Sequence, residues 1–343
     1  MKLGLMFTCL FVVLFISTTF VNKYVLSVLR FTYPTIFQGW QTLVGVIMFR
    51  ALLSTGHIDG FLHGKEWHEC ALWLPGMMSF LLSIYSGSRA LANLPIPVYL
   101  VMQNIVLVFK ATSDLMFHKQ ITSPCSYFML MLSLSSALFV AKTDPQYDPD
   151  GYHWMCVHVL SLGFFESYTN LIHGRLKLRA PERLFCCYFY SVIVLAPSSY
   201  FLGDALEAVK FPYFYFAQFY VGCIFSGVFG MLLSLCTIRL HEMKTPYSIL
   251  DANTVQSAAK ILCSCASLAF YDIEMSYTFF FFTAVNLFSS FGYCESSSHR
   301  RQPATEPQVI KSPDTNPGLK DVEMLQFLKR HELQQDMIRL DLG

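Results

Sequence analysis

The sequence feature that most restricts the fold of this chain is a series of long apolar segments. Ten of them, each about 17 to 25 residues long, lie at residues 3–21, 34–53, 70–88, 95–116, 122–141, 153–172, 184–202, 212–238, 247–270 and 275–293. Segments of this length and composition cross the hydrocarbon core of a bilayer as α-helices. The first lacks the small-x-small cleavage site of a signal peptide and is long enough to span. The sequence therefore predicts an all-α membrane protein with ten transmembrane helices.

Composition excludes several other classes of protein. Charged residues make up only 14% of the 343 residues, against about 25% in soluble domains. A formal net charge of +1 gives no basis for nucleic-acid binding, which needs clustered Lys and Arg. The eleven cysteines form no Cys/His set with the spacing of zinc ligands and are typical of small buried hydrophobic residues. We therefore expect the lipid bilayer as surroundings, no nucleic-acid partner, no metal and no cofactor.

The loops predict the orientation in the membrane. An even number of helices places both termini on one side. The loops on that side carry ten basic residues: Arg50, Lys65, Lys110, Lys119, Arg175, Lys177, Arg179, Arg183, Arg239 and Lys244. The loops on the other side carry five: Lys23, Arg30, Arg89, Lys142 and Lys210. Because cytosolic loops hold the excess of Lys and Arg, we expect both termini in the cytosol.

The ten helices divide into two repeats of five, at about 1–141 and 152–293, joined by an Asp-rich link. A repeat with an odd number of helices inverts relative to its partner, and transporters built this way bind substrate near the membrane midplane, at helices interrupted by Gly, Pro or polar residues. We expect such interruptions at Asn93–Asn104 in the fourth segment and at Ala196–Pro197 in the seventh.

After the membrane domain, 1–293, the composition changes to Ser, Pro, Gln and charged residues. This pattern predicts a flexible cytosolic tail, 294–343. Within it, residues 319–342 place apolar side chains at helical spacing. The alternatives are an amphipathic helix on the membrane or on a partner, and a weakly helical disordered end.

Lys260 lies well inside the ninth apolar segment. A charge at that depth costs about 2.5 to 3.5 kcal/mol, so it normally faces a protein interior or a water-filled cavity and binds something there. The alternative is that Lys260 lies near a helix end and extends to the headgroups. Placed in the interior, its ammonium group is suited to an anion such as phosphate.

Few other polar residues lie inside the predicted helices. Asn22 ends the first helix, and Tyr99 and Asn104 lie on the fourth. Aromatic residues such as those at Phe189–Tyr190–Ser191 in the seventh helix can stack on a nucleobase, or simply pack in the core. These residues suit an anion with an aromatic part. No nucleophile–base pair accompanies them, so the sequence predicts no catalytic residues and favours transport over catalysis.

At these residues the chain resembles the nucleotide-sugar transporters of the drug/metabolite transporter superfamily, the solute carrier 35 type. The branch of the Golgi GDP-mannose transporters is the most similar. The resemblance covers about residues 1–293. It rests on the Asn22–Leu26 end of the first helix, on Pro97, Tyr99 and Asn104 in the fourth, and on Ser226–Gly230 in the eighth.

Two motifs of that branch are altered here. Its seventh helix has Phe-Tyr-Asn-Asn, which reads guanine, where this chain has Phe189, Tyr190, Ser191 and Val192. Its ninth helix has Gly-Ala-Leu-Asn-Lys, which holds the sugar, where this chain has Gln256–Lys260. The resemblance thus implies substrate contacts from Lys260, Ser257 and Gln256, with the amides that read guanine replaced.

The resemblance implies an antiporter of the Golgi membrane, or alternatively of the endoplasmic reticulum, that exchanges a cytosolic nucleotide sugar for a nucleoside monophosphate. Because a site that hydrogen-bonds a group discriminates strongly for it, losing both guanine-reading amides favours a UDP-sugar, UDP-N-acetylglucosamine first. The alternatives are a GDP-mannose transporter and a membrane scaffold or sensor of the same fold without transport. Whether the chain forms a homodimer is left open.

Overall fold

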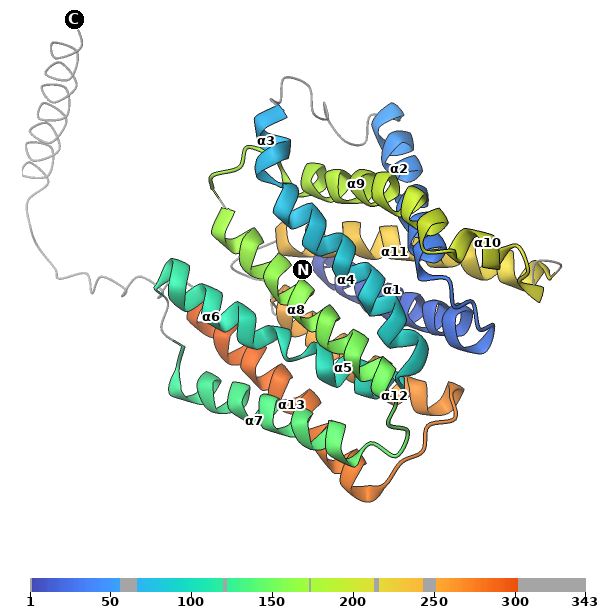
Figure 1. Cartoon of the computed structure of the whole chain (residues 1–343). Helices are drawn as coiled ribbons and strands as arrows, with labels where there is room; N and C mark the ends of the chain where they lie inside the picture. Colours follow the sequence, from blue (N-terminus) through green and yellow to red (C-terminus); the bar gives the residue numbers. More distant parts are fainter. Residues whose placement is uncertain are drawn as a thin grey trace, which may run out of the picture. The chain divides into compact units, whose positions relative to one another are not determined.

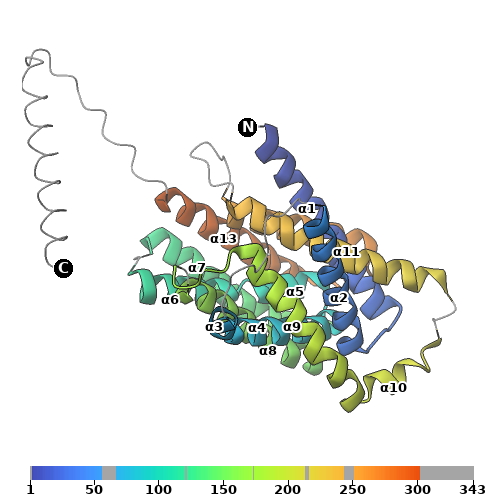
Figure 2. The same ribbon diagram turned by 90° about the horizontal axis from the view of Figure 1, so that it is seen from above.

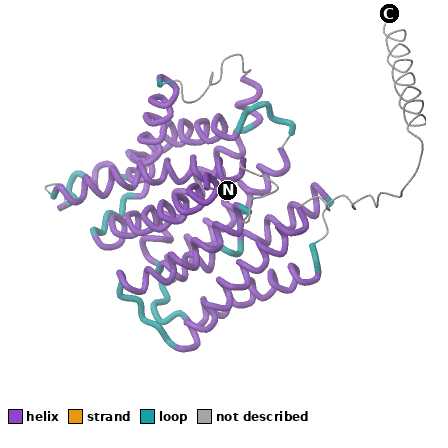
Figure 3. Tube along the Cα trace, turned by 180° about the vertical axis from the view of Figure 1, so that it is seen from behind, coloured by secondary structure: helices purple, strands orange, loops and turns teal. Residues whose placement is uncertain are grey.

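The structure is a computed structural model that describes residues 2–55, 67–119, 122–172, 174–212, 216–242 and 251–301. The described residues form helices joined by loops, without strands (Figure 3). The long helices are α1 (Lys2–Lys23), α2 (Pro34–Ser54), α4 (Leu74–Asn93), α7 (Pro124–Thr143), α8 (Pro149–Ile172), α9 (Ala180–Phe201), α11 (Ala217–Glu242), α12 (Ala252–Phe270) and α13 (Tyr277–Arg301). The shorter ones are α3 (Trp67–Leu72), α5 (Ile96–Gln103), α6 (Val106–His118) and α10 (Asp204–Ala208), and a π-helical turn, Tyr24–Val28, extends α1.

Within the described residues, six helical segments are long and apolar enough to cross a membrane. They are Gly4–Val28, Pro34–Ser54, Ile96–Phe117, Pro124–Thr143, Ala180–Phe201 and Ala217–Glu242. The chain is therefore an all-α, multi-pass membrane protein. The other long helices, α4, α8, α12 and α13, carry more polar residues, and the count of ten spans stays a prediction.

Proline marks the start of several helices. Pro34, Pro97 and Pro124 each stand in the first turn of their helix, where the N–H that proline lacks would have no intrahelical partner. Before Pro124, the Ser123 hydroxyl accepts a hydrogen bond from the Ser126 N–H and so caps α7.

Helices far apart in the sequence pack side by side. The most extensive pairings are α4 with α8 and α7 with α13, followed by α2 with α9 and α1 with α11 (Figures 1 and 2). Glycine permits the closest approaches. A Cβ atom at Gly163 of α8 would lie 2.5 Å from the Phe109 ring of α6, and one at Gly227 of α11 would lie 3.0 Å from Val44 of α2. By contrast, a Cβ at Gly230 of α11 would have no neighbour within 4 Å.

The fourth apolar segment is not one continuous helix. It consists of α5 and α6, with the break at Asn104 and Ile105. The Asn104 N–H donates to Val101 O at 3.1 Å and the Ile105 N–H donates to Met102 O at 3.1 Å. These tighter i→i−3 bonds keep the backbone paired through the break. Such turns inside a helix often mark functional hinges.

The interruption expected within Asn93–Asn104 is therefore present, whereas two expectations differ from the structure. The prediction that Ala196–Pro197 interrupts the seventh segment is wrong, because α9 continues through Pro197 to Phe201. The proline stands in the last turns of the helix, so few intrahelical bonds follow it. In addition, α13 and the compact unit both extend to Arg301, past the expected end at 293. The amphipathic helix expected at 319–342 lies outside the described residues.

The contact between α2 and α9 predicts which glycines are essential for packing. A Cβ at Gly45 would lie 2.4 Å from the buried Tyr188 ring, so Gly45→Ala should destabilise the protein by about 1–3 kcal/mol through overpacking. Gly230→Ala, a matched change in open space, should leave stability unchanged or raise it by up to about 1 kcal/mol. Thermal unfolding of the purified variants in detergent measures both, and equal midpoints for the two variants would contradict this packing.

Candidate functional site

Lys260 is buried in α12, eight residues after the helix begins at Ala252. Its side chain is 7% exposed. Its Nζ donates a hydrogen bond to Asn104 Oδ1 at 2.9 Å. The ammonium group therefore faces the protein interior, as expected, and the alternative in which it extends to the headgroups is wrong.

Asn104 connects Lys260 to a buried polar network across four helices. Its Nδ2 donates to Asn286 Oδ1 at 2.9 Å and to Ser290 Oγ at 3.1 Å, both on α13. Asn286 Nδ2 in turn donates to Ser133 O at 2.6 Å and to Ser136 Oγ at 3.2 Å on α7. The Asn104 side-chain NH2 group therefore donates to neutral partners, while its Oδ1 accepts the hydrogen bond from Lys260. The ammonium is held at the break between α5 and α6 by a group without charge.

A second buried polar cluster lies where α4, α5 and α8 meet. Tyr99 Oη and His158 Nε2 are 3.3 Å apart, and the rings stack with centroids 5.5 Å apart. His158 Nδ1 lies 2.8 Å from Ser83 O. A Cβ at Gly87 would lie 2.8 Å from His158 Nδ1, so only glycine leaves room for this ring. His158 was not expected at the site, although a histidine inside an apolar segment is a signal of the same kind as Lys260.

A polar cavity of about 510 Å³ opens at one end of the bundle. Its walls come from helix ends that meet there, the starts of α4, α9 and α12 and the ends of α6, α8 and α11. The charged and polar lining residues are Lys110, Asp114, Glu166, Thr169, Asn170, Arg183, Ser234, Thr237, His241, Glu242, Asp251 and Asn253. Under the expected topology this end is cytosolic. Asn253 in this wall lies on α12 seven residues before Lys260, so the cavity and the buried lysine share a helix.

The opposite end of the bundle is closed by packed side chains. Lys23 Nζ donates to the carbonyls of Leu91 at 2.9 Å, Ala92 at 3.2 Å and Leu94 at 2.9 Å. Phe31, Phe211 and Phe219 pack beside it with ring centroids 4.9 to 5.2 Å apart. Lys23 was counted as a loop charge from the sequence, yet it is buried and caps the end of α4. In the described part of the chain, the polar cavity therefore lies at one end of the bundle, and the Lys23 contacts and this aromatic cluster lie at the other.

The remaining expected site residues are spread over several helices. Asn22 Oδ1 accepts from Gln41 Nε2 at 3.0 Å and from Ser226 Oγ at 2.7 Å, which joins α1, α2 and α11. Ser257 is buried and donates to Cys294 Sγ at 3.3 Å, and Gln256 is half-buried. The structure brings Lys260, Asn104 and Ser257 onto the α12 side of the interior.

The three residues of the seventh segment lie elsewhere. Phe189 is 51% exposed and stacks on Phe185. Tyr190 borders an apolar groove between α4 and α9, and Ser191 donates to the Cys187 carbonyl of its own helix at 2.8 Å. They are not among the residues that line the polar cavity. Their role in reading a base stays a prediction.

Comparison with known proteins finds relatives along most of the chain. No model of a protein family matches it. The UDP-N-acetylglucosamine transporter TMEM241 homolog of Xenopus laevis is 34% identical over 273 residues, covering 80% of this chain and 89% of the relative. The UDP-N-acetylglucosamine transporter TMEM241 of Mus musculus is 36% identical over 265 residues, covering 76% and 83%. A GDP-mannose transporter of Chaetomium globosum is 24% identical over 327 residues, covering 89% and 80%.

The closed end generates a prediction about Lys23. Lys23→Met removes the donor to three carbonyls at the end of α4. Because hydrogen bonds to charged groups contribute about 1.5–3 kcal/mol, the midpoint of thermal unfolding should fall by roughly 5 °C. Lys142 is an exposed lysine at the end of α7. Lys142→Met is therefore the matched control and should leave the midpoint unchanged. A Lys23→Met protein as stable as the control would show that the carbonyls need no cap.

Proposed function

Because the chain belongs to the nucleotide-sugar transporter family, at 34% and 36% identity to the TMEM241 proteins, we propose that it carries UDP-N-acetylglucosamine across the Golgi membrane in exchange for UMP. Both relatives are named as transporters of UDP-N-acetylglucosamine, and the more distant fungal relative as a transporter of GDP-mannose. Members of this family are carriers and not enzymes.

The observation that carries the proposal is the environment of Lys260. The ammonium is buried, and its hydrogen-bond partner is the neutral amide of Asn104. A buried charge is costly unless it is paired, and a diphosphate supplies the missing counter-ion. The substrate enters through the polar cavity, passes Glu166 and Asn170, and places its phosphates at Lys260. Asn104 holds that ammonium and Ser257 lies one turn before it on α12, so both can contact the phosphates or the sugar, and Tyr99 on α5 is a further candidate contact.

The proposed architecture is ten transmembrane helices in two inverted repeats of five. Helix pairings support it, because they come in matched sets. In the two repeats, α1, α2, α4, α5–α6 and α7 are the counterparts of α8, α9, α11, α12 and α13. When each helix is exchanged for its counterpart, the α1–α11 pair becomes the α8–α4 pair. The α1–α12 pair corresponds to the pair of α8 with α6, and the α2–α9 and α7–α13 pairs each correspond to themselves.

In the proposed topology both termini are cytosolic, and the polar cavity opens to the cytosol. Closure of the cavity around bound substrate, followed by separation of Lys23 from the end of α4, would expose the same site to the lumen. The bonds that close the far end are hydrogen bonds to carbonyls and contacts between aromatic rings, which can break and reform without leaving an ion pair in the membrane.

The proposal is tested by counterflow in proteoliposomes. Vesicles containing the full chain and preloaded with UMP should accumulate labelled UDP-N-acetylglucosamine, and Lys260→Met should reduce uptake at least tenfold, since about 1.4 kcal/mol corresponds to a factor of ten. Uptake driven by GMP alone, with labelled GDP-mannose as the cargo, would support the GDP-mannose alternative. No uptake of any nucleotide sugar with either monophosphate would support the non-transporting alternative.

Asn104 provides a second test, because its partner atoms are known. Asn104→Asp places a carboxylate beside the Lys260 ammonium, which then has an internal counter-ion that competes with phosphate. Uptake should therefore fall further in Asn104→Asp than in Asn104→Ala, although the aspartate is the closer replacement in shape. Initial rates of counterflow, normalised to the amount of folded protein, measure the order. The reverse order would show that Asn104 acts through its Nδ2 contacts and not through the charge of Lys260.

A further inference from the structure

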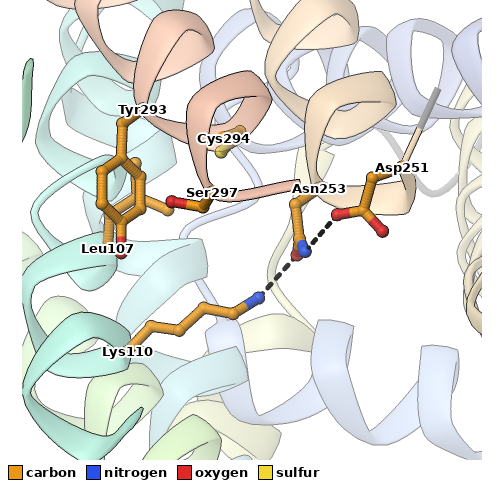
Figure 4. A pocket seen from close by; sticks show the side chains of 7 residues that line it. All are labelled: Leu107, Lys110, Asp251, Asn253, Tyr293, Cys294 and Ser297. Atoms are coloured by element: carbon orange, nitrogen blue, oxygen red, sulfur yellow. Dashed lines mark hydrogen bonds between the residues drawn. The ribbon is translucent and has the colours of Figure 1, made fainter. Parts of the chain in front are cut away.

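Lys110 of α6 forms a second lysine–asparagine pair at the mouth of the polar cavity. Its Nζ donates to Asn253 Oδ1 at 2.6 Å, and Asn253 Nδ2 donates to Asp251 Oδ2 at 2.8 Å (Figure 4). Lys110 was counted as a loop charge from the sequence. In the structure it lies within α6, half-buried, and lines the cavity.

The two lysine–asparagine pairs are reciprocal. At the mouth, a lysine of α6 donates to an asparagine of α12, and deeper in the bundle a lysine of α12 donates to Asn104, which ends α5. Asn253 and Lys260 are seven residues apart on α12 and so share a face of the helix. Their separation along the axis is about 10 Å at 1.5 Å per residue. Along this side of the bundle two cations thus follow each other, Lys110 in the cavity wall and the buried Lys260 deeper, each held by a neutral amide.

We propose that Lys110, with Asn253, is a phosphate-binding station at the mouth of the cavity, which receives the phosphates of an arriving nucleotide sugar and releases those of the departing nucleoside monophosphate. This inference rests on the proposed function. An asparagine side chain satisfies one of the three donors of an ammonium group and carries no charge, so Lys110 can take a phosphate oxygen without giving up an ion pair with Asn253.

Three of the carboxylates that line the cavity accept a hydrogen bond from a neighbour. Asp251 accepts from Asn253, Asp114 accepts from Asn170 Nδ2 at 3.4 Å, and Glu242 accepts from Arg239 at 3.1 Å. These bonds orient the acids while Lys110 lines the cavity, and Arg183 on the α9 wall lines it as a second cation. The lining therefore places two cations, Lys110 and Arg183, among carboxylates that other hydrogen bonds hold in place.

The test compares ligands that differ by one phosphate. Thermal stabilisation of the purified full chain by UMP and by uridine is measured for the wild type, Lys110→Gln, Lys110→Arg and Lys119→Gln. Lys110→Gln should weaken UMP binding about tenfold, the effect of losing one charge-assisted contact, and leave uridine binding unchanged. Lys110→Arg should recover part of the loss. Lys119 is exposed at the end of α6 and does not line the cavity, so Lys119→Gln is the matched control.

The kinetics of counterflow distinguish the role of the Lys110 station from that of the deeper Lys260. Lys110→Gln should raise the KM for UDP-N-acetylglucosamine about tenfold and change the maximal rate less, because the station acts in capture. A Lys110→Gln protein with wild-type UMP affinity would overturn the inference, and so would one whose uridine binding is weakened as much as its UMP binding. In both cases, transport by the wild type would leave the proposed function intact. A wild type that neither binds nor transports nucleotides would instead overturn the proposed function.

Discussion

The structure depends on how each polar group inside the membrane is satisfied, since the bilayer core offers no water to an unpaired N–H, C=O or ammonium. Two buried lysines meet this constraint differently. Lys23 donates to three backbone carbonyls at the end of α4, groups that need a donor because the helix ends there. Lys260 donates to one side-chain amide. The first lysine completes the fold, whereas the second retains binding capacity for a ligand.

The same constraint explains why the interior between α5, α7, α12 and α13 is rich in serine and asparagine. Asn104, Asn286 and Ser133 form a continuous set of hydrogen bonds, and such a network is favourable only when its members are paired. It holds the two halves of the fourth segment in place where α5 gives way to α6. The fourth segment is thus interrupted at Asn104 and is held there by side-chain hydrogen bonds. Such an arrangement can both position a site and act as a hinge.

The sequence predicts the helices well because hydropathy alone identifies segments that must lie in the membrane. It also places Lys260 in the interior, since a charge at that depth is too costly without a protein environment. It predicts an interruption within Asn93–Asn104, but it does not place the break at Asn104, where the turn is stabilised by tertiary contacts with α13. At Pro197 the sequence predicts an interruption that the structure does not have, because α9 continues through the proline. Lys23 and Lys110 lie near the ends of apolar segments, so counting loop charges assigns them to water, and only the packing of other helices shows otherwise.

A lysine held by an amide also gives a physical reason for exchange in a carrier of this kind. Closing the cavity over Lys260 removes water from its ammonium, and desolvating a charge without a counter-ion costs several kcal/mol. In the proposed function, bound phosphate provides that counter-ion, so closure around either nucleotide species is favoured over closure of the empty site. A carrier that works in this way changes sides when loaded and resists doing so when empty, which would couple the inward movement of one phosphorylated ligand to the outward movement of another.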